Sequence, residues 1–178
     1  MPKGTLDPDR PHRIALAALE VVADKGVEGL THRAVAAVAG VPLGSTTYHF
    51  KTLDDLLAAA VVEAKSATDA ELAAWASTLG RGTDLVRAIA DYVMQALSQH
   101  WGRTVVEHEL YMAALRRPQL LALSREWDEA FPAVLAEHVD EVTAQTVAMV
   151  VDGMYVRAFI HGMPDRAEIE LVLRRLLD

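Results

Sequence analysis

Apolar residues recur at helical spacing along most of the chain. A first helix is predicted from an apolar face with the i, i+3, i+4, i+7, i+8 pattern, formed by Ile14, Ala17, Ala18, Val21 and Val22. This helix is expected to end at Lys25-Gly26, because a glycine just past the last turn readily takes the backbone conformation needed there. The short stretch before residue 14, rich in proline and charge, is not part of this pattern.

The same spacing predicts eight further helices, over residues 33–39, 43–49, 53–78, 85–99, 103–116, 118–139, 143–161 and 165–177. Thr31, Thr52 and Asp84 stand where helix N-caps are needed, and Pro132 is expected to kink the long seventh helix. Few segments show the alternation of apolar and polar residues that is typical of a β-strand. We therefore predict an all-α protein of about nine helices, with a three-helix N-terminal domain at residues 1–52 and a helical bundle at residues 53–178.

Composition narrows the class of protein. The chain has 178 residues, 52% of them hydrophobic, and no cysteine, which excludes disulfide frameworks, thiolate catalysis and cysteine metal sites. Its longest aliphatic run, residues 56–62, is too short to cross a bilayer. A secretion signal would have an apolar stretch after Lys3, and the sequence has none there. We expect a cytoplasmic protein with no membrane partner.

Charge is distributed unevenly. The net charge of −8 argues at first against binding nucleic acid. However, residues 1–52 carry six basic and five acidic side chains, whereas residues 53–178 carry 11 basic and 20 acidic ones. Only the N-terminal domain could approach a polyanion.

Residues 31–49 have the parts of a helix-turn-helix. Ala36 is small where two helices must pack closely, Gly40 permits a tight turn, and Val41 supplies an apolar plug. The second helix, Leu43-Gly44-Ser45-Thr46-Thr47-Tyr48-His49, is rich in small hydroxyl side chains that suit base edges and phosphates in a major groove. Spacing alone leaves open a polar helical hairpin with no role in DNA binding.

A resemblance to a known family favours DNA binding. The order and spacing of one set of residues closely resemble the DNA-binding domain of TetR-family transcriptional regulators over about 45 positions: Arg13-Ile14, Ala17-Ala18, Gly26, Leu30-Thr31, Val35-Ala36, Ala39-Gly40-Val41, Gly44-Ser45, Tyr48-His49-Phe50 and Leu56-Leu57. The resemblance implies that the third helix reads DNA and that the later helices bind a ligand and form a dimer.

The resemblance also assigns candidate DNA contacts. It places Thr31, His32 and Arg33 near the phosphate backbone, Leu43, Gly44, Ser45 and Thr47 at base edges, and Tyr48, His49 and Lys51 at the backbone again. Three positions depart from the family pattern. Pro42 replaces a Ser or Thr cap, Thr47 replaces a longer Tyr, and Leu53 replaces a Lys that would contact phosphate.

Large side chains in the second domain are candidates for a ligand pocket, which the resemblance favours over an ordinary core. The candidates are Trp75, Tyr92, Trp101, His108, Tyr111, Met112, Trp127, Phe131 and Tyr155. Among them His108, Tyr111 and Met112 share one helix face, so that His108 could be a polar group in an apolar cavity.

The last two helices are candidates for a dimer interface. The last helix has a wide apolar stripe, and the helix before it is apolar on nearly all sides, which requires burial on both sides. The candidate interface residues are Val147, Val151, Met154, Ile169, Val172, Leu173 and Leu176. Packing within one chain is the alternative.

No pattern indicates catalysis, a metal or a cofactor. Glu107, His108 and Glu109 are adjacent, and neighbouring helical residues diverge by about 100°, so they cannot converge on one ion. We predict a homodimeric, ligand-responsive transcription regulator, acting as a repressor that a small, largely apolar molecule releases from a pseudo-palindromic DNA operator. The alternative is a helical protein that binds or sequesters a small molecule and no longer reads DNA.

Overall fold

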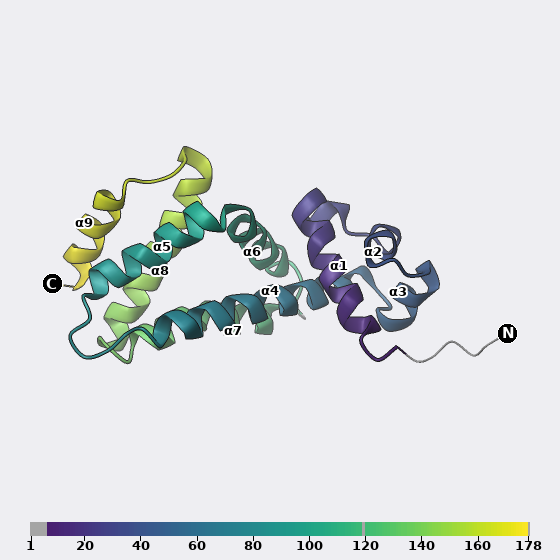
Figure 1. Cartoon of the computed structure of the whole chain (residues 1–178), viewed down its shortest axis with the longest axis horizontal. Coiled ribbons are helices and arrows are strands. Elements are labelled where there is room, and N and C mark those ends of the chain that lie inside the picture. Colours follow the sequence, from purple (N-terminus) through teal and green to yellow (C-terminus); the bar gives the residue numbers. More distant parts are fainter. Residues whose placement is uncertain (1–6, 119, 178) are drawn as a thin grey trace. The chain divides into compact units, whose positions relative to one another are not determined.

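The computed structural model describes residues 7–118 and 120–177, and every regular element in this part is helical (Figure 1). The elements are α1 (Arg10–Lys25), η1, a 3₁₀ turn (Val27–Gly29), α2 (His32–Ala39), α3 (Leu43–His49), α4 (Leu53–Ala76), α5 (Leu85–Gln99), α6 (Trp101–Ala114), α7 (Leu121–Leu135), α8 (Glu141–His161) and α9 (Arg166–Leu177). The all-α prediction is confirmed for this part. The expectations about residues 1–6, including the missing secretion signal, lie outside it. No helix of the described part is long and apolar enough to cross a membrane.

Packing divides the chain into two compact units. We call residues 1–66 and 106–123 the head unit, and residues 67–105 and 124–178 the body unit. Helices α4 and α6 each contribute residues to both units. The domain boundary expected at residue 52 does not coincide with a boundary between these two units, and it stays a prediction.

The head unit has a small apolar core. Ile14 and Val21 of α1, Val35 of α2, and Leu56 and Val61 of α4 are almost fully buried. Helix α1 packs against α2, and α2 packs against α3 (Figure 1). His12 at the start of α1 lies 3.3 Å from Glu63 of α4, between imidazole and carboxylate atoms.

The ends of α2 follow the predicted local chemistry. Thr31 Oγ1 accepts a hydrogen bond from the Ala34 backbone N–H at 3.1 Å, which caps the helix. At the other end Gly40 has φ 64°, in the left-handed region, and the Val41 N–H donates to the Ala36 carbonyl at 3.1 Å. The glycine therefore makes the tight turn that directs the chain into α3.

A segment from later in the chain completes the head unit. The Glu109 carboxylate of α6 accepts a hydrogen bond from the Val27 backbone N–H at 2.6 Å, in the turn that follows α1. Arg117 Nε donates to Asp54 Oδ1 at 2.9 Å, in the first turn of α4. These two charged contacts fix residues 106–123 to elements that precede them by more than sixty positions.

The later helix ends differ from the predicted ones. Helix α6 begins at Trp101, two residues before the expected start, and α7 covers Leu121–Leu135 rather than residues 118–139. Backbone bonds from Leu120 to Arg117 and from Leu121 to Pro118 form a turn where the helix was expected to begin. Pro132, which has no backbone N–H to donate, lies in the last turn of α7. Only three helical residues follow the position where a kink was expected.

The core of the body unit is formed by α5, α8 and α9. Helix α5 packs against both α8 and α9, and α8 packs against α9 (Figure 1). The buried side chains come mainly from these three helices and are Val86, Ile89, Ala90, Val93, Leu97, Ala144, Val147, Val151, Tyr155, Ala158, Ile169 and Leu173, with Leu135 from α7. One side of the apolar helix α8 is thus covered within the chain itself.

Candidate DNA-reading surface and effector site

The buried Thr46 sets which side of α3 faces outward. Its side chain is 0% exposed, and its Oγ1 donates to the Leu43 carbonyl at 2.8 Å, so a polar residue fills the inner side of the short helix. Successive helical residues diverge by about 100°. Gly44 and Tyr48 are therefore directed away from the core, with Thr47 and Leu43 beside them.

The outward residues of α3 are well exposed. The Leu43 side chain is 45% exposed and that of Tyr48 is 71% exposed, while Gly44, Thr47 and His49 also lie at the surface. Thr47 Oγ1 lies 3.3 Å from the Gly44 carbonyl, to which it donates. Ser45 is half-buried at the side of the helix. The helix thus presents a shallow surface with few charges.

A cation lies against the end of this surface. Lys51 Nζ is 5.3 Å from the centre of the Tyr48 ring, within the range of a cation–π contact. The rings of Tyr48 and His49 meet edge to face with centres 5.0 Å apart. The contacts hold the Lys51 ammonium group next to α3, where it could meet a phosphate.

The start of α2 supplies the other predicted phosphate contacts. Arg33 is exposed, Thr31 is exposed with its hydroxyl used as the helix cap, and His32 is half-buried. Near it, the Asp55 carboxylate accepts a hydrogen bond from the Thr52 N–H at 2.8 Å. This bond is the main reason that the pKa of Asp55 is lowered, and the charge of His32 is a minor one. The structure therefore brings the predicted DNA contacts together around α3 and the start of α2.

Three of the predicted ligand residues form one aromatic cluster in the body unit. The Trp75 ring centre lies 4.9 Å from that of Tyr92 and 5.6 Å from that of Phe131, and the Tyr92 and Phe131 rings are stacked 5.5 Å apart. The indole N–H of Trp75 donates to the Ala88 carbonyl at 3.2 Å, which fixes the ring. We call Trp75, Tyr92 and Phe131 the ring cluster.

The other predicted ligand residues are placed elsewhere. Trp101 meets Phe159 edge to face at 5.5 Å, Tyr155 is part of the body core, and Trp127 is half-buried on α7. His108, Tyr111 and Met112 belong to the head unit, and the Met112 side chain is exposed. Phe159 was left out of the nine predicted ligand residues, although it lies four residues after Tyr155 on the same helix and is one of the large side chains of the second domain.

The predicted dimer residues are mostly covered by their own chain. Val147, Val151, Ile169 and Leu173 are buried in the body core, whereas Met154 and Leu176 are half-buried and Val172 is exposed. The first four side chains are therefore not available to a partner. Their spacing marks the side of α8 and α9 that faces α5.

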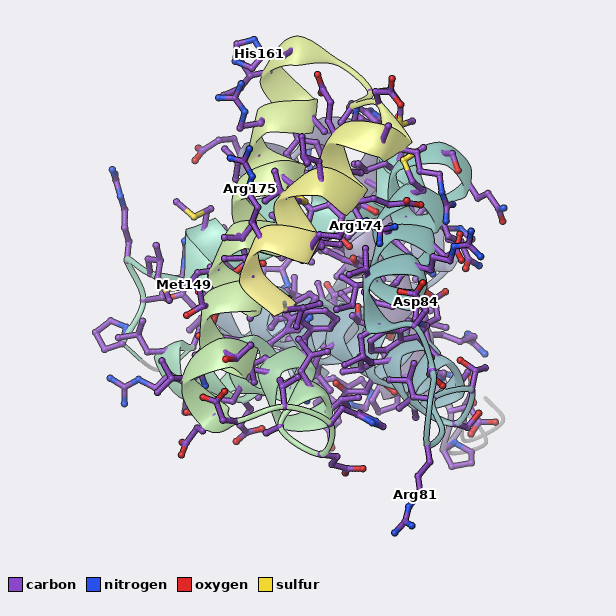
Figure 2. All side chains as sticks on the ribbon, turned by 90° about the vertical axis from the view of Figure 1, so that its left-hand side faces the viewer. Arg81, Asp84, Met149, His161, Arg174 and Arg175 are labelled. Carbon is purple, nitrogen blue, oxygen red and sulfur yellow. The ribbon has the colours of Figure 1, made fainter. Side chains whose placement is uncertain are left out.

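A different set of apolar residues lies on the outer side of α8. Val142, Met149 and Val156 follow each other at seven-residue intervals, and Ile160 comes one turn later. Met149 is 65% exposed and Ile160 is 69% exposed, and Figure 2 shows Met149 on the outer side of the helix. We call these four residues the α8 stripe. Its seven-residue spacing is visible in the sequence and could have identified it.

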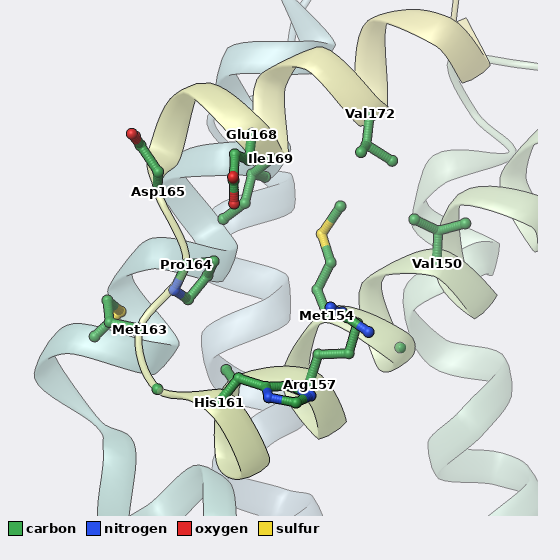
Figure 3. A pocket seen from close by; sticks show the side chains of 13 residues that line it. Val150, Met154, Arg157, His161, Met163, Pro164, Asp165, Glu168, Ile169 and Val172 are labelled. Atoms are coloured by element: carbon green, nitrogen blue, oxygen red, sulfur yellow. The ribbon is translucent and has the colours of Figure 1, made fainter.

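An open groove of about 570 Å³ lies between α8, α9 and the segment that joins them. Met154 and Val172 line its apolar part, while Arg157 on the α8 side and Glu168 on the α9 side bring charge to it (Figure 3). None of the predicted aromatic ligand residues lines it. The groove is thus a feature of the outer face of these helices rather than part of the ring cluster.

Asp152 on α8 titrates at an unusual pH. The protein around its carboxyl group displaces water and raises its pKa to about 6, and the carboxylate of Asp128 on α7 adds a smaller effect in the same direction. Asp152 as a whole residue is nevertheless exposed at the surface. Within the described residues, no group of three His, Cys, Asp or Glu side chains is arranged to hold a metal ion.

Comparisons with known proteins match both parts of the chain. Residues 14–60 match the family described as "Bacterial regulatory proteins, tetR family", and residues 80–178 match "Tetracyclin repressor-like, C-terminal domain". The HTH-type transcriptional regulator BetI of Cronobacter sakazakii is 27% identical over 94% of this chain and 88% of its own length.

Solved structures agree along nearly the whole chain. The multidrug binding protein EbrR complexed with ethidium is 42% identical, with a TM-score of 0.87 over 96% of this chain and 99% of that one. A TetR-family protein of Streptomyces coelicolor is also 42% identical, with a TM-score of 0.84 and the same coverage. Other EbrR structures contain proflavin or malachite green. With the helix-turn-helix in place at its N-terminal end, the chain belongs to the TetR family and is a ligand-responsive, DNA-binding transcription regulator rather than an enzyme.

Proposed function

We propose that the protein is a homodimeric repressor that leaves a pseudo-palindromic operator when a planar aromatic cation binds to its body unit. The observation that carries the choice of effector is the ring cluster. The three half-buried rings, which lie against the apolar core, offer flat contact area, and the negative face of an aromatic ring attracts a delocalised cation.

Similarity to EbrR supports the same effector class. EbrR has been crystallised with ethidium, proflavin and malachite green, which are all aromatic dyes with delocalised positive charge, and it shares about two residues in five with this chain. The acidic excess of residues 53–178 would also attract a cation and repel an anion. The largely apolar effector expected from the sequence thus becomes one with delocalised positive charge.

DNA binding would be confined to α3 and the start of α2. Arg33 and Lys51 are exposed there and can meet phosphates, while Gly44 and Thr47 face outward toward bases. The acidic body would be repelled by the duplex. A repressor acts by occupying its operator, so the location expected for this protein is the cytoplasm, where that DNA lies.

The dimer would form through the outer faces of α8 and α9. The α8 stripe and Val172 leave a row of apolar side chains uncovered beside the groove. Large uncovered apolar patches on single chains are typical of interfaces. A two-fold pairing would set the spacing of two α3 helices on successive major grooves.

The decisive experiment separates effector binding from operator binding. An operator would be selected from random duplex DNA, and the affinity of the full-length protein for ethidium would be measured without DNA by fluorescence. We expect Trp75→Ala to weaken ethidium binding by at least about tenfold and to leave operator affinity within about twofold. Trp127→Ala, which removes a half-buried tryptophan outside the ring cluster, is the matched control.

Because ethidium also binds DNA, release from the operator is judged against the Trp75→Ala protein at the same dye concentration. Dye that releases the parent protein but not the variant supports the proposal. Equal ethidium affinity of the parent and Trp75→Ala proteins would remove the ring cluster as the site. Operator binding that persists with saturating dye would remove the effector class.

A further inference from the structure

The outward side of α3 lacks every side chain that reads a base through two hydrogen bonds. Arg and Lys do this with guanine, Asn and Gln with adenine, and carboxylates accept from cytosine. The sequence of α3, Leu-Gly-Ser-Thr-Thr-Tyr-His, contains none of these six residue types. Whatever sequence preference α3 has must come from weaker hydrogen bonds or from apolar contact.

Apolar contact is what the exposed atoms offer. Leu43 is apolar and 45% exposed, although nothing in the chain requires it to be uncovered. The Thr47 hydroxyl donates within its own helix, to the Gly44 carbonyl at 3.3 Å or the Leu43 carbonyl at 3.5 Å, and in this orientation it offers a base its methyl group and an oxygen lone pair. The single apolar group that any base presents in the major groove is the 5-methyl of thymine.

Gly44 allows these side chains to come close to the bases. It lies beside Leu43 and Thr47 on the exposed side, and beyond its chain neighbours and the backbone of its own helix a Cβ added there would meet nothing within 4 Å. The space is therefore open for DNA rather than filled by protein. A helix without a side chain at this point can bring its backbone nearer to the base edges than one with a side chain.

On this basis, and given that α3 reads DNA, we propose that the protein recognises its operator mainly through thymine 5-methyl groups, which Leu43 and Thr47 contact. Arg33, Tyr48 and Lys51 would fix the position of the helix through phosphates but carry no base preference. The operator half-sites are then expected to contain thymines at fixed positions and no guanine that is essential for binding to α3.

Uracil substitution tests the proposal directly. Operators would be selected from random duplex DNA with the full-length protein, and each thymine would then be replaced by deoxyuridine, which removes only the methyl group. Burial of one carbon corresponds to about a fourfold change in affinity, so we expect about fourfold weaker binding for each thymine beneath α3. Thymines outside the α3 contact region serve as controls for changes in DNA flexibility.

A double-mutant design assigns the contacts to residues. Thr47→Ser keeps the hydroxyl and removes the methyl, and Leu43→Ala removes the exposed apolar side chain. Each variant should lose the difference between thymine and uracil at one position of the half-site and keep it at the others. Leu16→Ala, which removes a comparably exposed leucine from α1, should keep every difference.

The outcomes separate two failures. If a sequence is enriched and its binding is indifferent to uracil, or if the enriched half-sites depend on guanine instead of thymine, methyl recognition is overturned while DNA reading stands. If no sequence is enriched over random DNA, the operator-binding function itself is overturned. A thymine preference that persists unchanged in both Thr47→Ser and Leu43→Ala would also overturn the assignment.

Discussion

Two residues of α3 reverse the usual relation between polarity and burial. Thr46 is polar and fully buried, and it satisfies its hydroxyl by donating to the Leu43 carbonyl. Leu43 is apolar and exposed. A short helix with a polar inner residue and an apolar outer one would be poorly stable as an isolated surface element. This reversal is expected where the outer face is meant to be covered by something other than water.

The carboxyl group of Asp152 should make stability depend on pH. Its pKa is raised to about 6 in the folded protein and is close to 3.8 in the unfolded chain, so the folded state holds the proton more tightly. The contribution of this carboxyl group to the stability of the fold is therefore largest below about pH 4, and it is lost as the pH rises through 6. Asp152→Asn should therefore raise the melting temperature at pH 8, by about 2–4 °C, and change it little at pH 4.

Thermal unfolding at both pH values, followed by circular dichroism, checks this expectation. Glu129→Gln removes an exposed carboxylate from the neighbouring helix α7 and serves as the control. An equal effect of Asp152→Asn at pH 4 and pH 8 would show that the proton is not held more tightly in the folded state.

At the scale of single elements, local chemistry predicted helix boundaries best where a capping side chain or a glycine marks them. Thr31 and Asp84 cap α2 and α5 as expected, because a side-chain oxygen at that position has only nearby N–H groups to meet. The predicted end of α7 was wrong by four residues, because the backbone after Leu135 continues as turns, with the His138 N–H donating to the Leu135 carbonyl, rather than as helix. The helix-turn-helix could be predicted almost completely because its cap, its glycine turn and its short helices are also set by residues close together in the sequence.

The dimer face shows where sequence reasoning reaches its limit. An all-round apolar helix such as α8 reveals that both of its sides are covered, but not which side meets the same chain. Val147 and Val151 turned out to face α5, and Met149 and Ile160 face outward. Likewise, only three of the nine predicted ligand residues form the ring cluster. The sequence could not select these three, because contacts between rings on different helices depend on how those helices pack.

The contact between α6 and the turn after α1 should stabilise the head unit. Glu109→Ala removes the charged acceptor of the Val27 N–H in a partly buried place, which should lower the free energy of unfolding by about 1–3 kcal/mol. Glu109→Gln keeps a carbonyl oxygen at this position and should lose less. Urea denaturation of the three proteins measures both differences, and an Ala variant as stable as the Gln variant would contradict the expectation.

For the whole molecule, the α8 stripe predicts how two copies join. Met149→Asp and Ile160→Asp together place two charges on the outer face and should convert a dimer into a folded monomer at about 10 μM, because an unpaired charge in an interface costs several kcal/mol. Sedimentation velocity gives the mass, and circular dichroism confirms the fold. Leu173→Asp would be uninformative, since that side chain is buried in its own chain.

Val62→Asp is the control, because Val62 is also an exposed apolar residue but lies on α4, outside α8 and α9. It should leave the mass of the dimer unchanged. A dimer that survives the double substitution would place the interface on another surface.

The composition of the head unit has a consequence for exchanging specificity between regulators. Residues 106–123 belong to this unit, and Glu109 and Arg117 bind Val27 and Asp54 within it. A chimera with one crossover near residue 66 would take the two partners of both contacts from different parents, and one near residue 52 would do so for Val27 and Glu109. Recombination that preserves the unit needs three crossovers, near residues 66, 106 and 123, so that both segments are inherited together.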